Sequence, residues 1–145
     1  MASALEWSRI IDISPLINSK LAVFPGDVSF SEEFSMDLNK GDNLTLSAMK
    51  TTMHLGAHTD APNHYHALGH SIEKRDLSLY LGPVQVIEVQ VPRGERIQVL
   101  DLKNKEIKAP RVLFKTLSFP DPFVWNNDFV ALSPELIEYL HSQSV

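Results

Sequence analysis

The chain has 145 residues, a length typical of one domain with a single hydrophobic core. Its net charge of -5 argues against a nucleic-acid partner and against an anionic membrane surface. It contains no cysteine, which excludes disulfides, thiolate metal sites and a cysteine nucleophile. No run approaches the roughly 18 to 20 apolar residues of a membrane span. We therefore expect one domain over residues 1–145 with a small, weakly charged substrate and no membrane contact.

The first residues, from Met1 to Arg9, lack a basic start followed by an apolar stretch, so we expect no secretory signal. Together with the absence of cysteine, this favours a cytoplasmic protein.

In chain order, the first half of the sequence predicts strands and turns. Residues 10–13 form a short apolar stretch, which predicts a strand that ends at the following Ser-Pro. Residues 24–27, Phe-Pro-Gly-Asp, predict a turn, because proline fixes φ and glycine allows positive φ. Apolar and polar residues alternate over 44–48, which predicts a half-buried strand that leads towards a group of histidines.

The second half predicts three further strands, at residues 84–91, 111–117 and 128–132. Ser133, Pro134 and Glu135 predict a helix start, with a hydroxyl N-cap, proline at N1 and an acid in the first turn. A second helix is expected around residues 98–107. The fold class is α/β, with a strand-rich mixed sheet and few helices. Such a fold normally continues into another strand after its last helix, so we expect it to be C-terminally incomplete.

Residues 54–64 hold three of the six histidines and one carboxylate. A straight strand would point these three histidines and the carboxylate to one face. It would also place residues i and i+4 about 13 Å apart, which is too far for both to bind one metal ion through bonds of about 2 Å. Gly56 permits a bend and Pro62 discourages a continuous helix, so we expect a kinked strand-to-loop segment. The four residues are His54, His58, Asp60 and His64.

Imidazole nitrogen and carboxylate oxygen are the usual ligands of zinc, manganese or ferrous iron at an open catalytic site. We interpret the segment as the site of a metal-dependent hydrolase, but the spacing does not choose the chemistry, because a ferrous oxygenase or a polar loop with hydrogen-bonded histidines also fits it. An open site leaves room for substrate, so His64 is better suited to proton transfer than to ligation. His66 and His70 are expected at the surface or beside the ligands.

The segment resembles the signature of the cyclase-like metal hydrolases, a family that includes bacterial kynurenine formamidases and isatin hydrolases. The family pattern is His-x-Gly-Thr-His-x-Asp-x-Pro-x-His followed by an aromatic. It is matched from His54 to Tyr65, with Ala57 in place of the usual threonine. The resemblance runs almost end to end, with further matches at residues 12–15, 24–27, 80–83 and 111–116.

The resemblance implies a particular set of site residues. His54, His58 and Asp60 would be metal ligands, and His64 would be the catalytic proton-transfer residue. Phe24 would stand at the position of an aromatic that lines the substrate pocket. The cofactor would be a divalent metal, with Zn²⁺ expected first and Mn²⁺ as the alternative.

The implied activity is hydrolysis of an amide C–N bond, with N-formyl-L-kynurenine converted to L-kynurenine and formate in tryptophan degradation. An isatin-hydrolase-like cyclic amidase is the alternative. The resemblance also implies a homo-oligomer, a dimer or larger. Family members continue past the last helix with further site residues that this chain lacks. A partial, non-catalytic metal-binding domain is therefore a third hypothesis.

Overall fold

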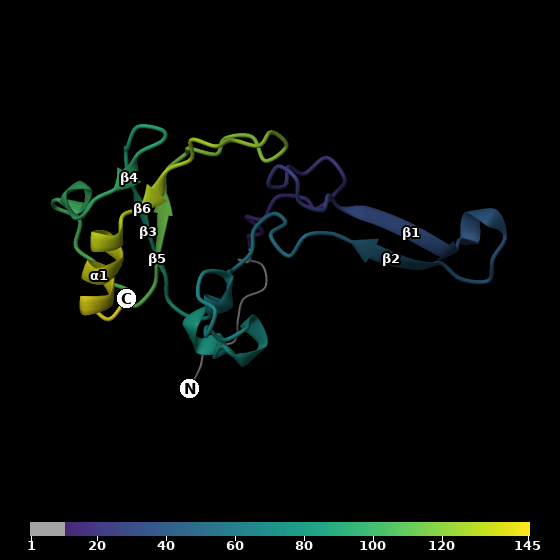
Figure 1. Ribbon diagram of the computed structural model, residues 1–145, viewed down its shortest axis with the longest axis horizontal. Helices are drawn as coiled ribbons and strands as arrows, with labels where there is room; N and C mark the ends of the chain where they lie inside the picture. Colours follow the sequence, from purple (N-terminus) through teal and green to yellow (C-terminus); the bar gives the residue numbers. More distant parts are fainter. Residues whose placement is uncertain (1–10) are drawn as a thin grey trace. The chain divides into compact units, whose positions relative to one another are not determined.

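The computed structural model describes residues 11–145, and it divides them into two compact units that are considered separately (Figure 1). The first unit holds the described chain from residue 11 to Thr59 together with Pro122–Val124. The second holds Asp60–Asp121 and Trp125–Val145. The organisation of residues 1–145 as a single domain remains a prediction.

The first unit contains a two-stranded antiparallel hairpin of β1 (Ser31–Met36) and β2 (Leu46–Lys50). The two strands are connected through a 3-10 turn, η2 (Leu38–Lys40). Asp37 caps this turn by accepting a hydrogen bond from the N–H of Asn39 at 2.8 Å. The hairpin is therefore held by its backbone ladder and by local polar bonds.

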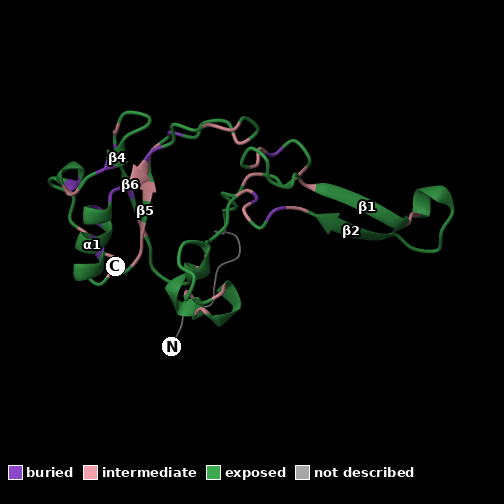
Figure 2. Cartoon of the chain, in the orientation of Figure 1, coloured by how far each residue is buried: buried purple, intermediate pink, exposed green. Residues whose placement is uncertain are grey.

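Two expectations for this unit are wrong. The half-buried strand predicted at 44–48 exists as β2, but all five of its residues are exposed, as the green hairpin of Figure 2 shows. The strand predicted at residues 10–13 is absent over its described part, 11–13, and residue 10 lies outside the described residues. Asp12 instead accepts a hydrogen bond from the N–H of Ser14 at 2.9 Å, a local bond that competes with strand pairing.

The second unit is built from two pairs of parallel strands and one α-helix. β3 (Gln85–Glu88) pairs with β5 (Val112–Lys115), and β4 (Arg96–Ile97) pairs with β6 (Ala131–Leu132). The helix is α1 (Pro134–Ser142). The expected α/β class with few helices is confirmed. The strands predicted at 84–91, 111–117 and 128–132 are present but shorter than predicted. Four short 3-10 turns complete the unit: η3 (Pro62–His64), η4 (Ile72–Lys74), η5 (Leu77–Leu79) and η6 (Val99–Leu102).

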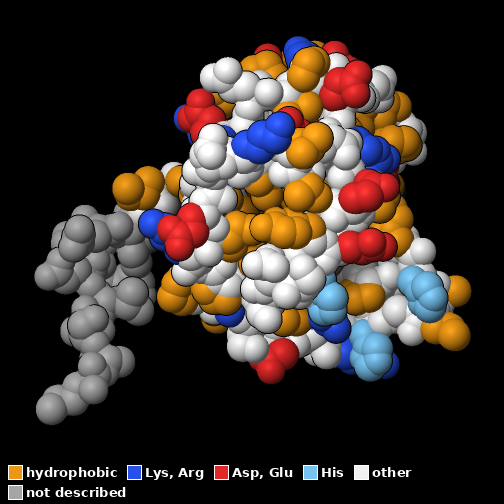
Figure 3. Space-filling model, turned by 90° about the vertical axis from the view of Figure 1, so that its left-hand side faces the viewer, with side chains coloured by type: hydrophobic (Ala, Val, Ile, Leu, Met, Phe, Trp, Pro, Cys, Tyr) orange, Lys and Arg blue, Asp and Glu red, His pale blue; other side chains and the backbone are white. Residues whose placement is uncertain are grey.

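A hydrophobic core lies between α1 and the strands of this second unit. Ile97 and Leu136 are fully buried, with 0% of their surface exposed. Apolar side chains also remain at the surface between charged ones (Figure 3). The other buried members of the core are Ile87, Val89, Leu102, Val130 and Leu140.

The predicted start of α1 is confirmed. Ser133 is 2% exposed, and its Oγ accepts a hydrogen bond from the N–H of Leu136 at 3.1 Å, as an N-cap does. The α-helix predicted around 98–107 is wrong, because only η6 forms there. Asn104 has φ of 66°, a left-handed conformation that a continuing helix does not allow. In residues 11–145 no helix has the length and apolar character needed to cross a bilayer.

Candidate metal site

The metal-binding candidates predicted from the sequence come together within one short stretch of chain. His54, His58 and Asp60 each offer a ligand atom, and these atoms all lie within 4.8 Å of one another. The stretch has no regular secondary structure and bends at Gly56, whose φ is 60°. A β-carbon at that glycine would also lie 3.2 Å from Leu21 Cδ2, so both conformation and space favour glycine there.

The two histidines are close enough to bind one ion. The Nδ1 atom of His54 and the Nε2 atom of His58 lie 3.2 Å apart, and the ring centroids are 5.2 Å apart at an interplanar angle of 66°. Two nitrogen ligands on a tetrahedral zinc, with bonds of about 2.0 to 2.1 Å, stand about 3.3 Å apart. The nitrogen pair therefore fits a shared divalent metal.

The orientation of His58 is fixed by the backbone of the same bend. Its Nδ1 atom lies 2.9 Å from the carbonyl oxygen of Gly56. Because a carbonyl only accepts, Nδ1 carries the proton, and Nε2 of the neutral ring keeps a lone pair. A carbonyl partner on one ring nitrogen is the usual way in which proteins select the tautomer of a metal ligand.

The backbone at His54 is tied to the turn at residues 24–27. Thr52 Oγ1 accepts a hydrogen bond from the His54 N–H at 3.1 Å and donates one to the carboxylate of Asp27. The Thr52 hydroxyl, followed by the N–H of Val28, holds the pKa of Asp27 below its ordinary value of 3.8. The ionised carboxylate of Asp27 thus holds the Thr52 hydroxyl, which in turn holds the backbone of His54.

No pattern in the sequence predicts a role for Asp27 or Thr52. The two residues are 25 positions apart in the chain, so no local spacing connects them. The available signal was the turn motif itself, since its last residue is the aspartate. The predicted turn is confirmed: the N–H of Asp27 donates to the carbonyl of Phe24 at 2.9 Å.

Phe24 lies in this turn with 59% of its surface exposed. Its role as the pocket aromatic remains a prediction. His66 and His70 are exposed, as expected for residues at the surface.

His64 ends the 3-10 turn η3 and is not part of the three-residue ligand group found in residues 11–145. Its N–H donates to the carbonyl of Ala61 at 2.9 Å. Its ring packs edge-to-face on Tyr65, with centroids 4.3 Å apart at 69°. The turn therefore fixes the backbone from which the imidazole projects, and the proton-transfer role of His64 remains a prediction.

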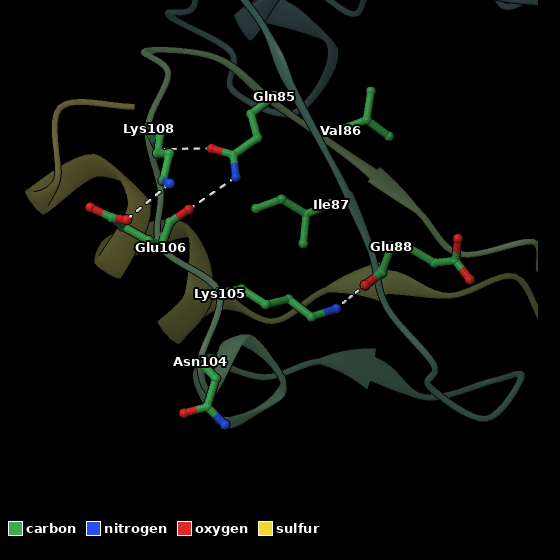
Figure 4. Close-up of a pocket in the computed structure, with 8 residues that line it drawn as sticks. All are labelled: Gln85, Val86, Ile87, Glu88, Asn104, Lys105, Glu106 and Lys108. Atoms are coloured by element: carbon green, nitrogen blue, oxygen red, sulfur yellow. Dashed lines mark hydrogen bonds and ion pairs between the residues drawn. The ribbon is translucent and has the colours of Figure 1, made fainter.

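An open hollow of about 520 Å³ lies elsewhere in the second unit, along the edge of β3 that does not pair with β5 (Figure 4). The Gln85 amide bridges it, donating to the carbonyl of Glu106 at 2.9 Å and accepting from the N–H of Lys108 at 2.7 Å. The Lys105 ammonium donates to the carbonyl of Glu88. None of its lining residues belongs to the metal-ligand group, so we interpret this hollow as structural.

The fold is shared with two solved structures described as metal-dependent hydrolases. One is a potential metal-dependent hydrolase with cyclase activity, with a TM-score of 0.71 at 20% identity over 92% of this chain and 63% of that chain. The other is a predicted metal-dependent hydrolase from Bacillus stearothermophilus, with a TM-score of 0.68 at 19% identity over 93% of this chain and 64% of that chain. At this identity the likeness establishes the fold.

The sequence matches the putative cyclase family over residues 11–145, and the chain belongs to that family. It is 35% identical over 133 residues to a kynurenine formamidase of Delftia acidovorans, covering 91% of this chain and 63% of the relative. It is 34% identical over 146 residues to a kynurenine formamidase of Erythrobacter litoralis, covering 100% of this chain and 66% of the relative. The chain thus spans about two thirds of the length of these curated relatives.

Proposed function

We propose that the chain acts as a metal-dependent hydrolase of an amide C–N bond, with N-formyl-L-kynurenine as substrate and L-kynurenine and formate as products. The observation that carries this proposal is the convergence of His54, His58 and Asp60 within 4.8 Å. The substrate is proposed from the likeness to kynurenine formamidases at 35% and 34% identity.

The residues of the chain would divide the work between binding and proton transfer. His54, His58 and Asp60 would hold a divalent metal, Zn²⁺ in the first instance. When bound, the metal supplies Lewis acidity towards the substrate carbonyl and towards water. His64 would carry a proton to the leaving nitrogen, a task suited to an imidazole whose ordinary pKa is about 6.5. Phe24 would contact the aryl group of the substrate.

The first test is hydrolysis of N-formyl-L-kynurenine by the 145-residue chain, before and after chelation, with Zn²⁺ or Mn²⁺ added back. We expect turnover that chelation removes and metal restores. Isatin is assayed in parallel, because faster turnover of isatin would make isatin the substrate in place of N-formyl-L-kynurenine. If the chain binds a stoichiometric amount of metal but hydrolyses neither compound, the hydrolase proposal is refuted in favour of a metal-binding domain.

Variants separate the ligands from the proton carrier. Asp60→Ala removes one of three ligands, so we expect stoichiometric metal binding to be lost. His64→Ala should retain the metal and lower kcat about 10²- to 10⁴-fold, the usual contribution of a general acid or base. His141→Ala, at an exposed histidine of α1, is the matched control and should change neither. Metal retained by Asp60→Ala at wild-type affinity would remove Asp60 from the site.

We also propose that the protein is a homo-oligomer that uses the β1–β2 hairpin. The hairpin exposes apolar side chains, with Phe34 at 49%, Leu46 at 53% and Met49 at 74% exposure, and a two-stranded hairpin alone is marginally stable in water. Met49 lies opposite Glu32 in the ladder, so Met49→Glu places two carboxylates together.

Sedimentation velocity tests this assembly. We expect a dimer or larger for the wild type and weaker association for Met49→Glu. Leu100→Glu is the control, because Leu100 is 67% exposed but belongs to η6 in the other unit. A monomeric wild-type chain at the highest concentration measured would refute the assembly.

A further inference from the structure

The segment from Pro62 to His70 forms a small loop that is closed on itself by backbone hydrogen bonds. The N–H of Asn63 donates to the carbonyl of His70 at 3.2 Å, which joins the two ends of the loop. The N–H of Gly69 donates to the carbonyl of His66 at 2.8 Å, and the N–H of His66 donates to that of Pro62 at 3.1 Å. All of these groups lie in the second unit, so the loop is a local structure.

Gly69 sits against the start of this loop with no room for a side chain. A β-carbon there would lie 2.5 Å from the carbonyl carbon of Pro62, 2.6 Å from its oxygen and 2.6 Å from the nitrogen of Asn63. Real β-carbons essentially never approach other atoms closer than 3.0 Å. All three neighbours are backbone atoms, which cannot rotate away as the end of a long side chain can.

The requirement for glycine at this position is spatial and not conformational. Five glycines of the described chain adopt positive φ, and Gly69 is not among them. Alanine could therefore take up the dihedral angles of residue 69, and the close approach to Pro62 and Asn63 is what excludes it.

The peptide that Gly69 contacts is also the one that sets the direction of His64. The carbonyl of Pro62 accepts hydrogen bonds from the N–H groups of Tyr65, at 3.3 Å, and His66, the two residues that follow His64. To reach the 3.4 Å of ordinary contact, a β-carbon at residue 69 would have to push this peptide away by about 1 Å. The turn η3 would then no longer hold the His64 backbone in its present place.

We propose that Gly69 is a positioning residue for His64: its missing side chain lets the loop close on the Pro62–Asn63 peptide and so fixes the imidazole. The proposal rests on the proposed function, in which His64 carries the proton. A misplacement of about 1 Å costs on the order of 10²-fold in rate when the displaced group takes part in the reaction.

A double-mutant cycle in the metal-loaded chain tests this relation by comparing wild type, Gly69→Ala, His64→Ala and the double variant. We expect Gly69→Ala to lower kcat about 10²-fold at unchanged metal content. The double variant should be no slower than His64→Ala, because a positioning residue has no effect once the group that it positions is removed. Effects that multiply in the double variant would overturn the proposal.

The matched control is Gly94→Ala. Gly94 adopts φ of +83°, and a β-carbon there would meet only Asp128 Cβ, at 3.9 Å. Alanine at residue 94 therefore strains the backbone of the same unit without touching the loop. We expect reduced stability but a kcat near that of wild type. An equal loss of kcat in this control would make the effect of Gly69→Ala one of general destabilisation.

Two measurements that need no turnover keep this test separate from that of the activity. In ¹H–¹³C spectra, the ring signals of His64 should shift in Gly69→Ala and stay in place in Gly94→Ala. In the wild type, the amide protons of Asn63 and His66 should be protected from exchange, as their hydrogen bonds require. If the wild type hydrolyses nothing, the proposed function fails while these measurements still decide the positioning. Unshifted His64 signals or unprotected amides would overturn it.

Discussion

The β1–β2 hairpin and the strands around α1 are both assembled from short segments, yet they bury very different amounts of side chain. The five residues of β2 are all exposed, whereas Ile97 and Leu136 of the second unit are completely buried. Burial of a large apolar side chain contributes about 1.5 to 3 kcal/mol, which backbone pairing in water does not match. The second unit is therefore stabilised by its core, and the hairpin by its backbone ladder and exposed polar bonds.

The sharpest test of this difference is in the core itself. Leu136→Ala should lower the free energy of unfolding by about 2 to 5 kcal/mol, because the site is fully buried and a cavity would remain. Urea denaturation measures this loss. Ile137→Ala is the control, since the neighbouring side chain on the same helix is 56% exposed, and it should stay within about 0.5 kcal/mol of wild type. Equal losses would refute the assigned core.

A serine in each region makes a hydrogen bond to the backbone, which allows a matched comparison. Ser133→Ala removes the buried cap of α1 and should cost about 1 kcal/mol, because the N–H of Leu136 loses its partner. Ser133→Thr keeps the hydroxyl and should recover most of the loss in the same denaturation assay. A threonine variant as unstable as the alanine variant would mean that packing, not capping, matters there.

The corresponding change in the hairpin should have a smaller effect. Ser35 Oγ donates to the carbonyl of Leu46 at 3.1 Å, but the bond is exposed. Water replaces it in Ser35→Ala, so the free energy of unfolding should change by no more than about 0.5 kcal/mol. A loss in Ser35→Ala as large as that in Ser133→Ala would contradict the exposure of this hydrogen bond and place the Ser35 hydroxyl inside the proposed homo-oligomer contact.

The smallest effect is electrostatic and concerns the exposed outer side of β3 and β5. The Lys115 ammonium lies 2.9 Å from the Glu88 carboxylate and, by its hydrogen bond first and its charge second, lowers the pKa of Glu88 from the ordinary 4.5. Lys115→Met should raise that pKa, which a ¹³C NMR titration of the carboxyl group measures.

The sign of the linked stability follows from the depressed pKa. The pair contributes above the ordinary carboxyl pKa, and its contribution is lost as pH falls through the lower pKa of the folded state. Both side chains are about half exposed, so the change in overall stability should be hard to detect. An unchanged Glu88 titration in Lys115→Met would refute the pairing.

Features that depend only on neighbouring residues could be predicted from the sequence. The start of α1 follows from Ser133 and Pro134, because capping chemistry is local. The turn at residues 24–27 follows from its proline and glycine in the same way. The proximity of His54, His58 and Asp60 was predictable because the three residues lie within one bend.

Features that depend on distant parts of the chain were not predictable. β1 was not predicted, because its two adjacent glutamates interrupt the alternation of apolar and polar residues by which a strand is recognised. An exposed hairpin needs no such alternation. The helix expected at 98–107 is replaced by the 3-10 turn η6, which ends at Leu102, and no pattern of apolar residues reveals the left-handed backbone of Asn104 that follows. The link between Asp27 and Thr52 joins residues 25 positions apart, and only the folded chain brings them together.

The bridging glutamine at β3 has a consequence for how the chain behaves at high concentration. An unpaired strand edge presents backbone groups on which a second molecule can add a strand, the first step of many fibrils. Lys105 takes one such group, the carbonyl of Glu88, and the Gln85 side-chain amide holds the backbone at Glu106 and Lys108 beside the strand, so the same molecule covers part of that edge. Loss of the Gln85 amide or of the Lys105 ammonium group would therefore leave more of this strand edge open to a second molecule.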